Sequence, residues 1–600
     1  MISHIENENK VIVSNSKISF TINYTDGLRI NDVIHCHTER SWLEAPCDPF
    51  VLTIKGEEFP ASTFKITKIA VMDDGKQECV AFEMKSPPPW ELTSRVSFYS
   101  ELEDSYMMLI QFGAVWPDDC PEEVFMHLPI FSLFGQKNNK WYLSSNPVSR
   151  SDGSSLMQTH DEFDLPICNI ATDRKTGFSM EFRDIAKWGF CWNQVRNCEF
   201  LHMTKEEQLQ DNRVLLRLQN EYLADVFEMR IFALDNGWSE AFDCWRQRVR
   251  EKMDLAEYYR EDLQWYRKVL YQHFTFAFSK EVFNYETLEF ELDRLIADGE
   301  KFGGYDSVLL WYQYPRLGVD ERKQWDFNED IPGGMVGMRD FTRRAHEKGV
   351  RVFLPYKPWD LRFDETPQSV VENIVRVVKE TEIDGIWFDT MDAVPDGLRE
   401  KIDMIRPGVL FCTELHPALI KSIEDITGHW DQFMEFTMPS SNILRFLFPE
   451  NNAPITSRWQ VGVGKDQLIS RAIFNGTGIA IWQDIFGSWL PFSANQQETI
   501  KKWKKILLDH FDTYFGLKAI PCYPALQDGL YINKFSADDR SETIYSIYNE
   551  NDRPTEGALF EICSEGGNLK ELWRNAKLSI EGSIVHGEIK SRENLIVSVR

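Results

Sequence analysis

Two carboxyl residues stand at the ends of two short apolar segments near the middle of the chain. Asp389 ends the segment Gly385-Ile-Trp-Phe-Asp389, and Glu414 ends the segment Val409-Leu-Phe-Cys-Thr-Glu414. Cleavage of a glycosidic bond needs a proton donor at the leaving oxygen and a nucleophile or base on the opposite face of the sugar, and two carboxyl groups can supply both. The pair therefore predicts a glycoside hydrolase.

The elements around the two residues predict that they lie together. Each apolar segment is typical of a buried strand, and a helix is predicted between them over residues 395–405, closed by Pro407-Gly408. A strand–helix–strand crossover is right-handed and makes its two strands parallel neighbours. Asp389 and Glu414 are then expected at the same C-terminal edge, where barrels of such units build their active sites.

The side-chain lengths suggest roles for the two residues. Neighbouring strands lie about 4.8 Å apart, which suits the separation of about 5–5.5 Å that gives retention, whereas about 6.5–9.5 Å gives inversion. Asp389, with the shorter side chain, suits the nucleophile. Glu414 suits the general acid/base, with a pKa raised by aromatic surroundings and the nearby carboxylate. The alternative is that each residue caps the following helix, and that Asp392 bonds backbone or steers Asp389.

Eight alternating strand and helix patterns surround this pair and predict a (β/α)₈ barrel over residues 269–516. An open doubly wound sheet is the alternative, but no Gly-rich phosphate loop follows an early strand. The predicted strands cover residues 270–278, 306–311, 350–354, 385–389, 409–414, 431–436, 458–461 and 478–482. The predicted helices cover residues 286–299, 333–348, 368–380, 395–405, 417–426, 440–448, 466–474 and 495–510.

The flanking regions read as β-structure. Residues 1–237 alternate strand-like runs with turn signals such as Asp26-Gly and Asp74-Gly and predict a large β-sandwich. Residues 238–268 change to a helical period and predict a linker helix. Residues 517–600 return to short strands and predict a small C-terminal β-sandwich. The fold class is therefore α/β, a barrel between two sandwiches.

Composition narrows the possible partners. The net charge is −28, from 94 Asp and Glu against 66 Lys and Arg, and a field of this sign disfavours nucleic acid and anionic membranes. The aromatic content of 13% suits both a large core and a cleft that stacks on sugar rings. An oligosaccharide or glycoside is the expected substrate, and homo-oligomerisation is left open. The 11 scattered Cys and the absence of an apolar leader predict a cytoplasmic protein.

The strand that ends in Asp389 also carries a family resemblance. Gly385-Ile-Trp-Phe-Asp-Thr-Met-Asp392 resembles the fourth-strand nucleophile signature of retaining α-glycosidases of the α-glucosidase and α-galactosidase clans. Upstream, Trp325-Asp326-Phe, Pro332, Met338 and His346-Glu-Lys-Gly-Val-Arg-Val-Phe-Leu-Pro-Tyr-Lys-Pro358 resemble the second-to-third-strand region of the same enzymes. The resemblance covers about residues 305–415 and implies that Asp389 is the nucleophile of an exo-acting α-glycosidase.

The acid/base departs from the α-glucosidase pattern. That pattern places an Asp after the sixth strand, whereas Glu414 follows the fifth, which is similar to α-amylase-type barrels and to endo-α-N-acetylgalactosaminidases. Asp431 and Glu435, on the predicted sixth strand, are the fallback acids. The amylase-type histidine–aspartate pair is not recognisable on the seventh strand, so the sugar stays open.

Further residues at the predicted strand ends are candidates for substrate binding. Trp387, two residues before Asp389, is expected to point into the barrel, where packing is the alternative to ligand contact. For Lys357 a surface charge is the alternative. The full candidate set is Trp311, Tyr314, Lys357, Trp359, Asp360, Trp387, Asp392, His416, Trp482 and Asp484.

No metal or cofactor is predicted. The sequence has no His-Glu-x-x-His motif, and its one His-x-His, His35-Cys36-His37, lies in the predicted N-terminal sandwich. On a strand those two histidines would share a face. Two other functions stay open, a non-catalytic sugar-binding protein on a barrel scaffold and an inverting glycosidase or transglycosidase.

Overall fold

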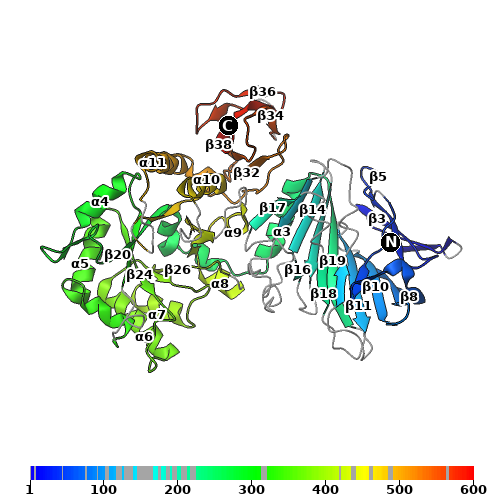
Figure 1. Cartoon of the computed structure of the whole chain (residues 1–600), viewed down its shortest axis with the longest axis horizontal. Coiled ribbons are helices and arrows are strands. Elements are labelled where there is room, and N and C mark those ends of the chain that lie inside the picture. The colour runs from blue at the N-terminus through cyan, green and yellow to red at the C-terminus, as the bar shows by residue number, and fades with distance from the viewer. Residues whose placement is uncertain are drawn as a thin grey trace. The chain divides into compact units, whose positions relative to one another are not determined.

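The chain separates into two compact units, Met1–Arg248 and Val249–Arg600 (Figure 1). The computed structural model describes residues 2–5, 8–43, 45–73, 77–90, 92–101, 107–115, 124–127, 140–144, 167–172, 177–183, 190–191, 199–203, 213–216, 224–312, 321–417, 420–433, 441–457, 464–483, 485, 491–562 and 567–600. No helix among these residues is both long enough and apolar enough to cross a bilayer.

The first unit is built from antiparallel sheets. Their strand orders are β1-β2-β3-β4-β5, β16-β18-β12-β6-β7 and β17-β13-β14-β15-β19-β11-β10-β9-β8. Val13, Phe82 and Met126 come from the three different sheets and belong to one buried core, which makes the unit a β-sandwich. The bounds are β1 (Ile2–Ile5), β2 (Lys10–Ser14), β3 (Ile18–Asn23), β4 (Arg29–His35), β5 (Arg40–Ser41), β6 (Val51–Ile54), β7 (Glu57–Pro60), β8 (Lys65–Asp73), β9 (Gln77–Lys85), β10 (Thr93–Glu101), β11 (Met107–Val115), β12 (Val124–His127), β13 (Lys140–Ser144), β14 (Ile167–Thr172), β15 (Gly177–Arg183), β16 (Phe190–Cys191), β17 (Glu199–Met203), β18 (Arg213–Leu216) and β19 (Ala224–Leu234).

The segment predicted as one linker helix is three shorter helices. The α-helix α3 (Trp238–Arg250) is followed by two 3₁₀-helices, η3 (Ala256–Tyr259) and η4 (Glu261–Lys268). Just before η3, the carboxylate of Asp254 accepts a hydrogen bond from the N–H of Ala256, at 3.0 Å. Such a local side-chain bond offers the backbone an alternative to the helical pattern.

The second unit contains the (β/α)₈ barrel that the alternating pattern predicts. All paired barrel strands are parallel, and β31 pairs with β20. The sixth strand is split at Trp430 into β27, which pairs with β26, and β28, which pairs with β30, so the barrel closes through this strand. The strands are β20 (Tyr271–Phe276), β23 (Ser307–Trp311), β24 (Arg351–Tyr356), β25 (Gly385–Phe388), β26 (Leu410–Thr413), β27 (Gly428–His429), β28 (Asp431–Phe433), β30 (Ile455–Ser457) and β31 (Ile479–Trp482).

Helices surround the barrel strands on the outside (Figure 1). They are α4 (Leu292–Glu300), α5 (Gly334–Glu347), α6 (Pro367–Thr381), α7 (Leu398–Ile405), α8 (Ile420–Asp425), α9 (Ile443–Leu447), α10 (Lys465–Asn475) and α11 (Ala494–Asp509). Helix α6 starts where the sequence provides a cap, because the hydroxyl of Thr366 accepts from the N–H of Ser369 and Pro367 opens the first turn.

Aromatic side chains fill the barrel. The ring of Trp387 lies 5.3 Å from Trp311, 4.5 Å from Trp430 and 6.0 Å from Phe274, and Trp482 lies 5.7 Å from Trp430. These rings come from different strands of the barrel. The barrel interior is therefore a packed core, and chemistry has to take place at its edge.

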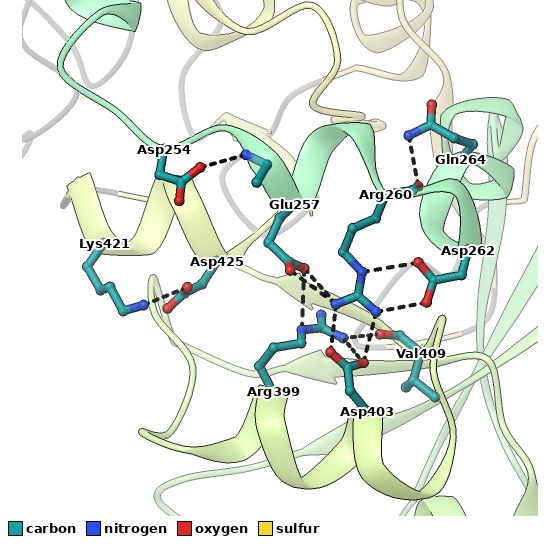
Figure 2. A network of polar contacts seen from close by, with 11 residues as sticks. Asp254, Glu257, Arg260, Asp262, Gln264, Arg399, Asp403, Val409, Lys421 and Asp425 are labelled. Atoms are coloured by element: carbon teal, nitrogen blue, oxygen red, sulfur yellow. Dashed lines mark hydrogen bonds and ion pairs between the residues drawn. The ribbon is translucent and has the colours of Figure 1, made fainter.

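A network of ion pairs holds η3 and η4 against α7 on the N-terminal side of the barrel (Figure 2). Arg260 donates to Asp403 at 2.7 Å and to Asp262 at 2.8 Å. Arg399 donates to the carbonyl of Val409, at 2.9 Å, just before β26 begins. Arginine forks matched to carboxylates in this way fix one element against another.

The C-terminal part of the second unit is a small β-sandwich. Its two sheets have the orders β32-β33-β38-β35 and β34-β37-β36 and share one buried core. Its bounds, with the helix before it, are α12 (Phe511–Tyr514), β32 (Leu530–Ser536), β33 (Thr543–Asn549), β34 (Thr555–Glu561), β35 (Leu569–Glu571), β36 (Ser579–Glu581), β37 (Ile584–Ile589) and β38 (Asn594–Val599).

Two local expectations differ from the structure. The helix predicted from residue 286 begins only at Leu292, because β21 (Phe283–Asn284) and β22 (Glu289–Phe290) form a hairpin first. The Asn284 side chain accepts from the N–H of Glu286 at 2.9 Å and closes its turn. The strand predicted at 458–461 lies outside the described residues, and the seventh barrel strand in the structure is β30.

Candidate active site

Asp389 and Glu414 directly follow two paired strands. Phe388 at the end of β25 pairs with Thr413 at the end of β26. The N–H of Glu414 donates to the carbonyl of Phe388 at 3.0 Å, and the N–H of Asp389 donates to the carbonyl of Tyr356 at 2.9 Å. Each side chain is only 7% exposed. The two residues are therefore neighbours at the C-terminal edge of the barrel.

Two N–H donors hold the carboxyl group of Glu414. The backbone N–H of Thr390 donates to Oε2 at 2.8 Å, and Nε2 of Gln432 donates to Oε1 at 3.1 Å. Thr390 has a φ of 55°, which is costly for a β-branched residue. This strained turn aims a backbone donor at Glu414, so both of its oxygens act as hydrogen-bond acceptors.

Asp389 has a different environment. Nε1 of Trp359 donates to Oδ2 of Asp389 at 3.0 Å. Burial raises the pKa of Asp389, and the Glu414 carboxyl, which lies within hydrogen-bonding reach and carries like charge, raises it further. The Trp359 bond and the charge of Lys357 oppose this rise in pKa without cancelling it. A buried group with a pKa shifted in this way is a candidate for acid–base chemistry.

Lys357 and Asp360 form a buried pair beside the carboxyl groups, in the loop after β24. Their side chains are 1% and 0% exposed, with Nζ of Lys357 3.6 Å from Oδ2 of Asp360. Burial lowers the pKa of Lys357 to about 8, although Asp360 and Asp389 favour its charged form. The Lys357 ammonium also lies 5.8 Å from the centre of the Trp311 ring. Lys357 is therefore a buried group close to Asp389, and it is not the surface charge that was the alternative.

The remaining candidate residues are distributed over several environments. Trp311, Trp387 and Trp482 are 2%, 2% and 4% exposed and belong to the aromatic core of the barrel. Asp392 is half-buried in the loop after β25. Tyr314 and Asp484 lie outside the described residues.

His416 and Asp431 lie together, on a different side of the sixth strand from Glu414. Nε2 of His416 is 3.7 Å from Oδ1 of Asp431, and Arg471 of α10 is 3.9 Å from the same oxygen. Side chains alternate along a strand, so Asp431 points toward α10 while its neighbour Gln432 reaches Glu414. This placement gives no support to Asp431 as the fallback acid, and Glu435 lies outside the described residues.

Sequence reasoning missed Gln432 and Thr390. Gln432 stands two residues after Trp430, a barrel-core residue, and a period of two along the strand would have placed both on one face. The predicted strand began at Asp431, so Trp430 was left out of the alternation. The contact of Thr390 depends on its left-handed backbone, for which its residue type gives no warning.

The histidines of the His-x-His motif do not share a face. His35 ends β4 and is buried, with Nε2 2.9 Å from the carbonyl of Leu234, whereas His37 is exposed in the following turn. Among the residues that the structure describes, no three His, Cys, Asp or Glu side chains gather in a way that could hold a metal ion.

Comparisons with known proteins give structural likeness only. No protein-family model and no curated protein matches the sequence. An α-N-acetylgalactosaminidase from Bifidobacterium bifidum matches in structure in its Gal-NHAc-DNJ complex, with a TM-score of 0.52 and 11% identity over 91% of this chain and 98% of that chain. Its GalNAc complex gives the same TM-score and coverage at 10% identity. A GH36 α-galactosidase from Geobacillus stearothermophilus in complex with raffinose gives a TM-score of 0.46 at 10% identity, over 98% and 100%. The chain thus shares the fold of a barrel α-glycosidase.

Proposed function

We propose that the protein is a glycoside hydrolase that cleaves α-linked sugars with retention of configuration. The observation that carries this proposal is the contact between two buried carboxyl groups, Asp389 and Glu414, at the C-terminal edge of adjacent barrel strands. This edge is where barrel enzymes place their chemistry. The shared fold with an α-N-acetylgalactosaminidase agrees with it.

The contact favours retention over inversion. An inverting enzyme needs a water molecule between its base and the sugar and keeps its carboxyl groups about 6.5–9.5 Å apart, whereas retaining pairs lie about 5–5.5 Å apart. Carboxyl groups within hydrogen-bonding reach of each other are much closer than an inverting pair and leave no room for such a water between them. A covalent intermediate then takes the place of a directly attacking water.

In the proposed first step, Asp389 attacks the anomeric carbon while Glu414 gives a proton to the leaving oxygen. The bond between the anomeric carbon and the leaving oxygen breaks, and its electron pair stays with the protonated leaving group. In the second step Glu414 takes a proton from water, the water oxygen attacks the anomeric carbon, and Asp389 leaves as a carboxylate. Lys357, beside Asp389, supplies positive charge to that carboxylate.

The reverse assignment of roles is the second candidate, and one observation favours it. Glu414 accepts two N–H hydrogen bonds, and the pKa of Asp389 is raised, so the free protein holds its proton on Asp389. In this version Glu414 attacks and Asp389 protonates the leaving group. Both versions give retention. They differ in which anomer of the glycosyl azide each variant forms when azide restores its activity.

Azide rescue of two variants tests the proposal and separates the roles. The substrate comes from a screen of nitrophenyl α-glycosides that starts with the α-N-acetylgalactosaminide and the α-galactoside. Asp389→Ala with azide should give the β-glycosyl azide, because azide replaces the nucleophile in a single displacement. Glu414→Ala with azide should give the α-glycosyl azide, because azide attacks the glycosyl-enzyme.

The products can contradict the proposal in two ways. The opposite pair of anomers would reverse the two roles. Wild-type protein that binds sugars but turns over no glycoside, with unchanged binding in Asp389→Ala, would instead show a sugar-binding protein. NMR of the product anomers assigns the roles, and a sugar-binding titration beside the turnover assay tests for a binding protein.

A further inference from the structure

Trp359 touches one carboxyl group of the reactive pair and reaches solvent at the same time. Its indole Nε1 lies 3.0 Å from Oδ2 of Asp389. Asp389 is 7% exposed, whereas Trp359 is 42% exposed. The indole therefore connects a nearly buried carboxyl group to the surface of the barrel edge. We propose that Trp359 is a positioning residue that orients Asp389 and controls its protonation. This inference rests on the proposed glycosidase function.

The backbone on both sides of Trp359 is held by one buried side chain. Gln324, which is 4% exposed, accepts from the N–H of Lys357 at 3.1 Å. Its Nε2 donates to the carbonyl of Lys357 at 2.9 Å and to the carbonyl of Asp360 at 3.3 Å. The indole is thus presented to Asp389 from a fixed loop, so little conformational freedom is lost when the hydrogen bond forms.

The chemistry of the indole suits control of a carboxylate. An indole N–H only donates, so the bond to Oδ2 of Asp389 stabilises the ionised carboxylate and opposes the effect of burial and of Glu414. Because the indole is neutral, it does this without placing a positive charge beside a sugar whose ring gains positive charge in the transition state. Trp359 thus lowers the pKa of Asp389 below the value that burial and Glu414 alone would give, and so raises the fraction that is ionised at a given pH.

Trp359→Phe tests this role because it keeps a flat apolar ring and removes the donor. Loss of a hydrogen bond to a charged group should lower kcat/KM about tenfold on the acid side of the pH profile and move that limb up by about one pH unit. KM on the plateau should stay within about threefold. Trp265→Phe is the matched control, since its indole donates to the carbonyl of Gly408 at 3.2 Å, at the start of β26, and its profile should follow the wild type.

The limb that moves decides between the outcomes. A shift of the acid limb supports the role of Trp359 with Asp389 as nucleophile. A shift of the alkaline limb supports the role of Trp359 but makes Asp389 the proton donor, which overturns the preferred role assignment. Unmoved limbs, or a loss of activity that is uniform over pH, would overturn the inference about Trp359.

A titration without turnover keeps this test separate from the proposed function. Protein labelled with ¹³C at the aspartate carboxyl carbons gives an Asp389 signal that Asp389→Asn identifies by its disappearance. Trp359→Phe should move the titration midpoint of that signal upward by about one pH unit. The same midpoint in both proteins would refute the inference, whether or not any glycoside is cleaved.

Discussion

Two buried aspartates bracket strand β25, and their surroundings are opposite in kind. Asp384, before the strand, is 2% exposed and receives Nε2 of His346 at 2.7 Å, the N–H of Val352 at 2.9 Å and Arg351 at 2.9 Å. Burial alone would raise the pKa of Asp384, but these donors outweigh it and the pKa is lowered. Asp389, after the strand, is also buried, which raises its pKa, and its neighbour Glu414 raises that pKa further.

Both aspartates are buried, so the opposite directions of their pKa shifts come from the groups that contact them. At the N-terminal edge, Asp384 and the Arg260 network (Figure 2) match their negative charges with guanidinium groups. The Arg260 hydrogen bonds lower the pKa of Asp262. At the C-terminal edge, two carboxyl groups face each other. One edge therefore stabilises the fold, and the other keeps two carboxyl groups in contact at a cost in stability, as expected of a functional site.

The largest expected effect is on catalysis at the C-terminal edge. Asp389→Asn should lower kcat about 10⁴-fold, because an amide can neither attack the sugar nor give up a proton. Its free energy of unfolding should be unchanged or higher, because the repulsion from Glu414 is removed. Kinetics on the best nitrophenyl glycoside and thermal denaturation measure the two quantities. A folded, fully active variant would contradict the assignment of the site.

The opposite result is expected at the N-terminal edge. Asp384→Ala leaves the buried N–H of Val352 without its acceptor and should lower the free energy of unfolding by about 1–3 kcal/mol. The kcat of the folded fraction should stay within about twofold of the wild type. Asp293→Ala is the control, since this side chain is 87% exposed and should change stability by less than about 0.5 kcal/mol.

The two aspartates should also give opposite dependences of stability on pH. The folded protein binds a proton at Asp389 more tightly than the unfolded chain does, so this group lowers stability as pH rises above its ordinary pKa of about 3.9. Asp384 has a lowered pKa and contributes stability that is lost as pH falls below about 3.9. In the wild type, the free energy of unfolding should therefore decline between about pH 4 and neutral pH because of Asp389. Denaturation curves measured over this pH range should show no such decline for Asp389→Asn. A decline of unchanged slope would show that Asp389 is not the group responsible.

The smallest effect is expected in the Arg260 network. Its guanidinium is 21% exposed, so solvent and salt screen its ion pairs. Arg260→Met should lower the free energy of unfolding by about 1 kcal/mol, and the loss should shrink at high salt. Arg343→Met is the control, because its ion pair with Glu347 is 59% exposed and should contribute little to stability. If both variants lost the same free energy of unfolding, the Arg260 network would be no more stabilising than the exposed ion pair of Arg343.

The sequence predicted the fold and the pair of carboxyl groups for physical reasons. Strands buried on both faces read as continuous apolar runs, and the right-handed crossover makes consecutive strands parallel neighbours. The positions of Asp389 and Glu414 at one edge follow from these two rules. The roles of the two residues depend on donors from other loops and stay a prediction.

The parts that the sequence did not predict depend on contacts between distant segments. Trp387 was expected to point inward, and it does, but its place in the ring cluster follows from Phe274 and Trp430 on other strands. Gln432 reaches Glu414 from the sixth strand, which is split at Trp430. No local period records such a break.

The left-handed backbone of Thr390 has a consequence for engineering. Glycine at this position would relieve the torsional cost and restrict the chain less, and a search for heat-resistant variants would select it for the first reason. Yet the same torsion orients the N–H of Thr390 that donates a hydrogen bond to Oε2 of Glu414. Sequence optimisation for shelf life alone would thus tend to loosen Glu414, which the proposed mechanism needs held in one orientation.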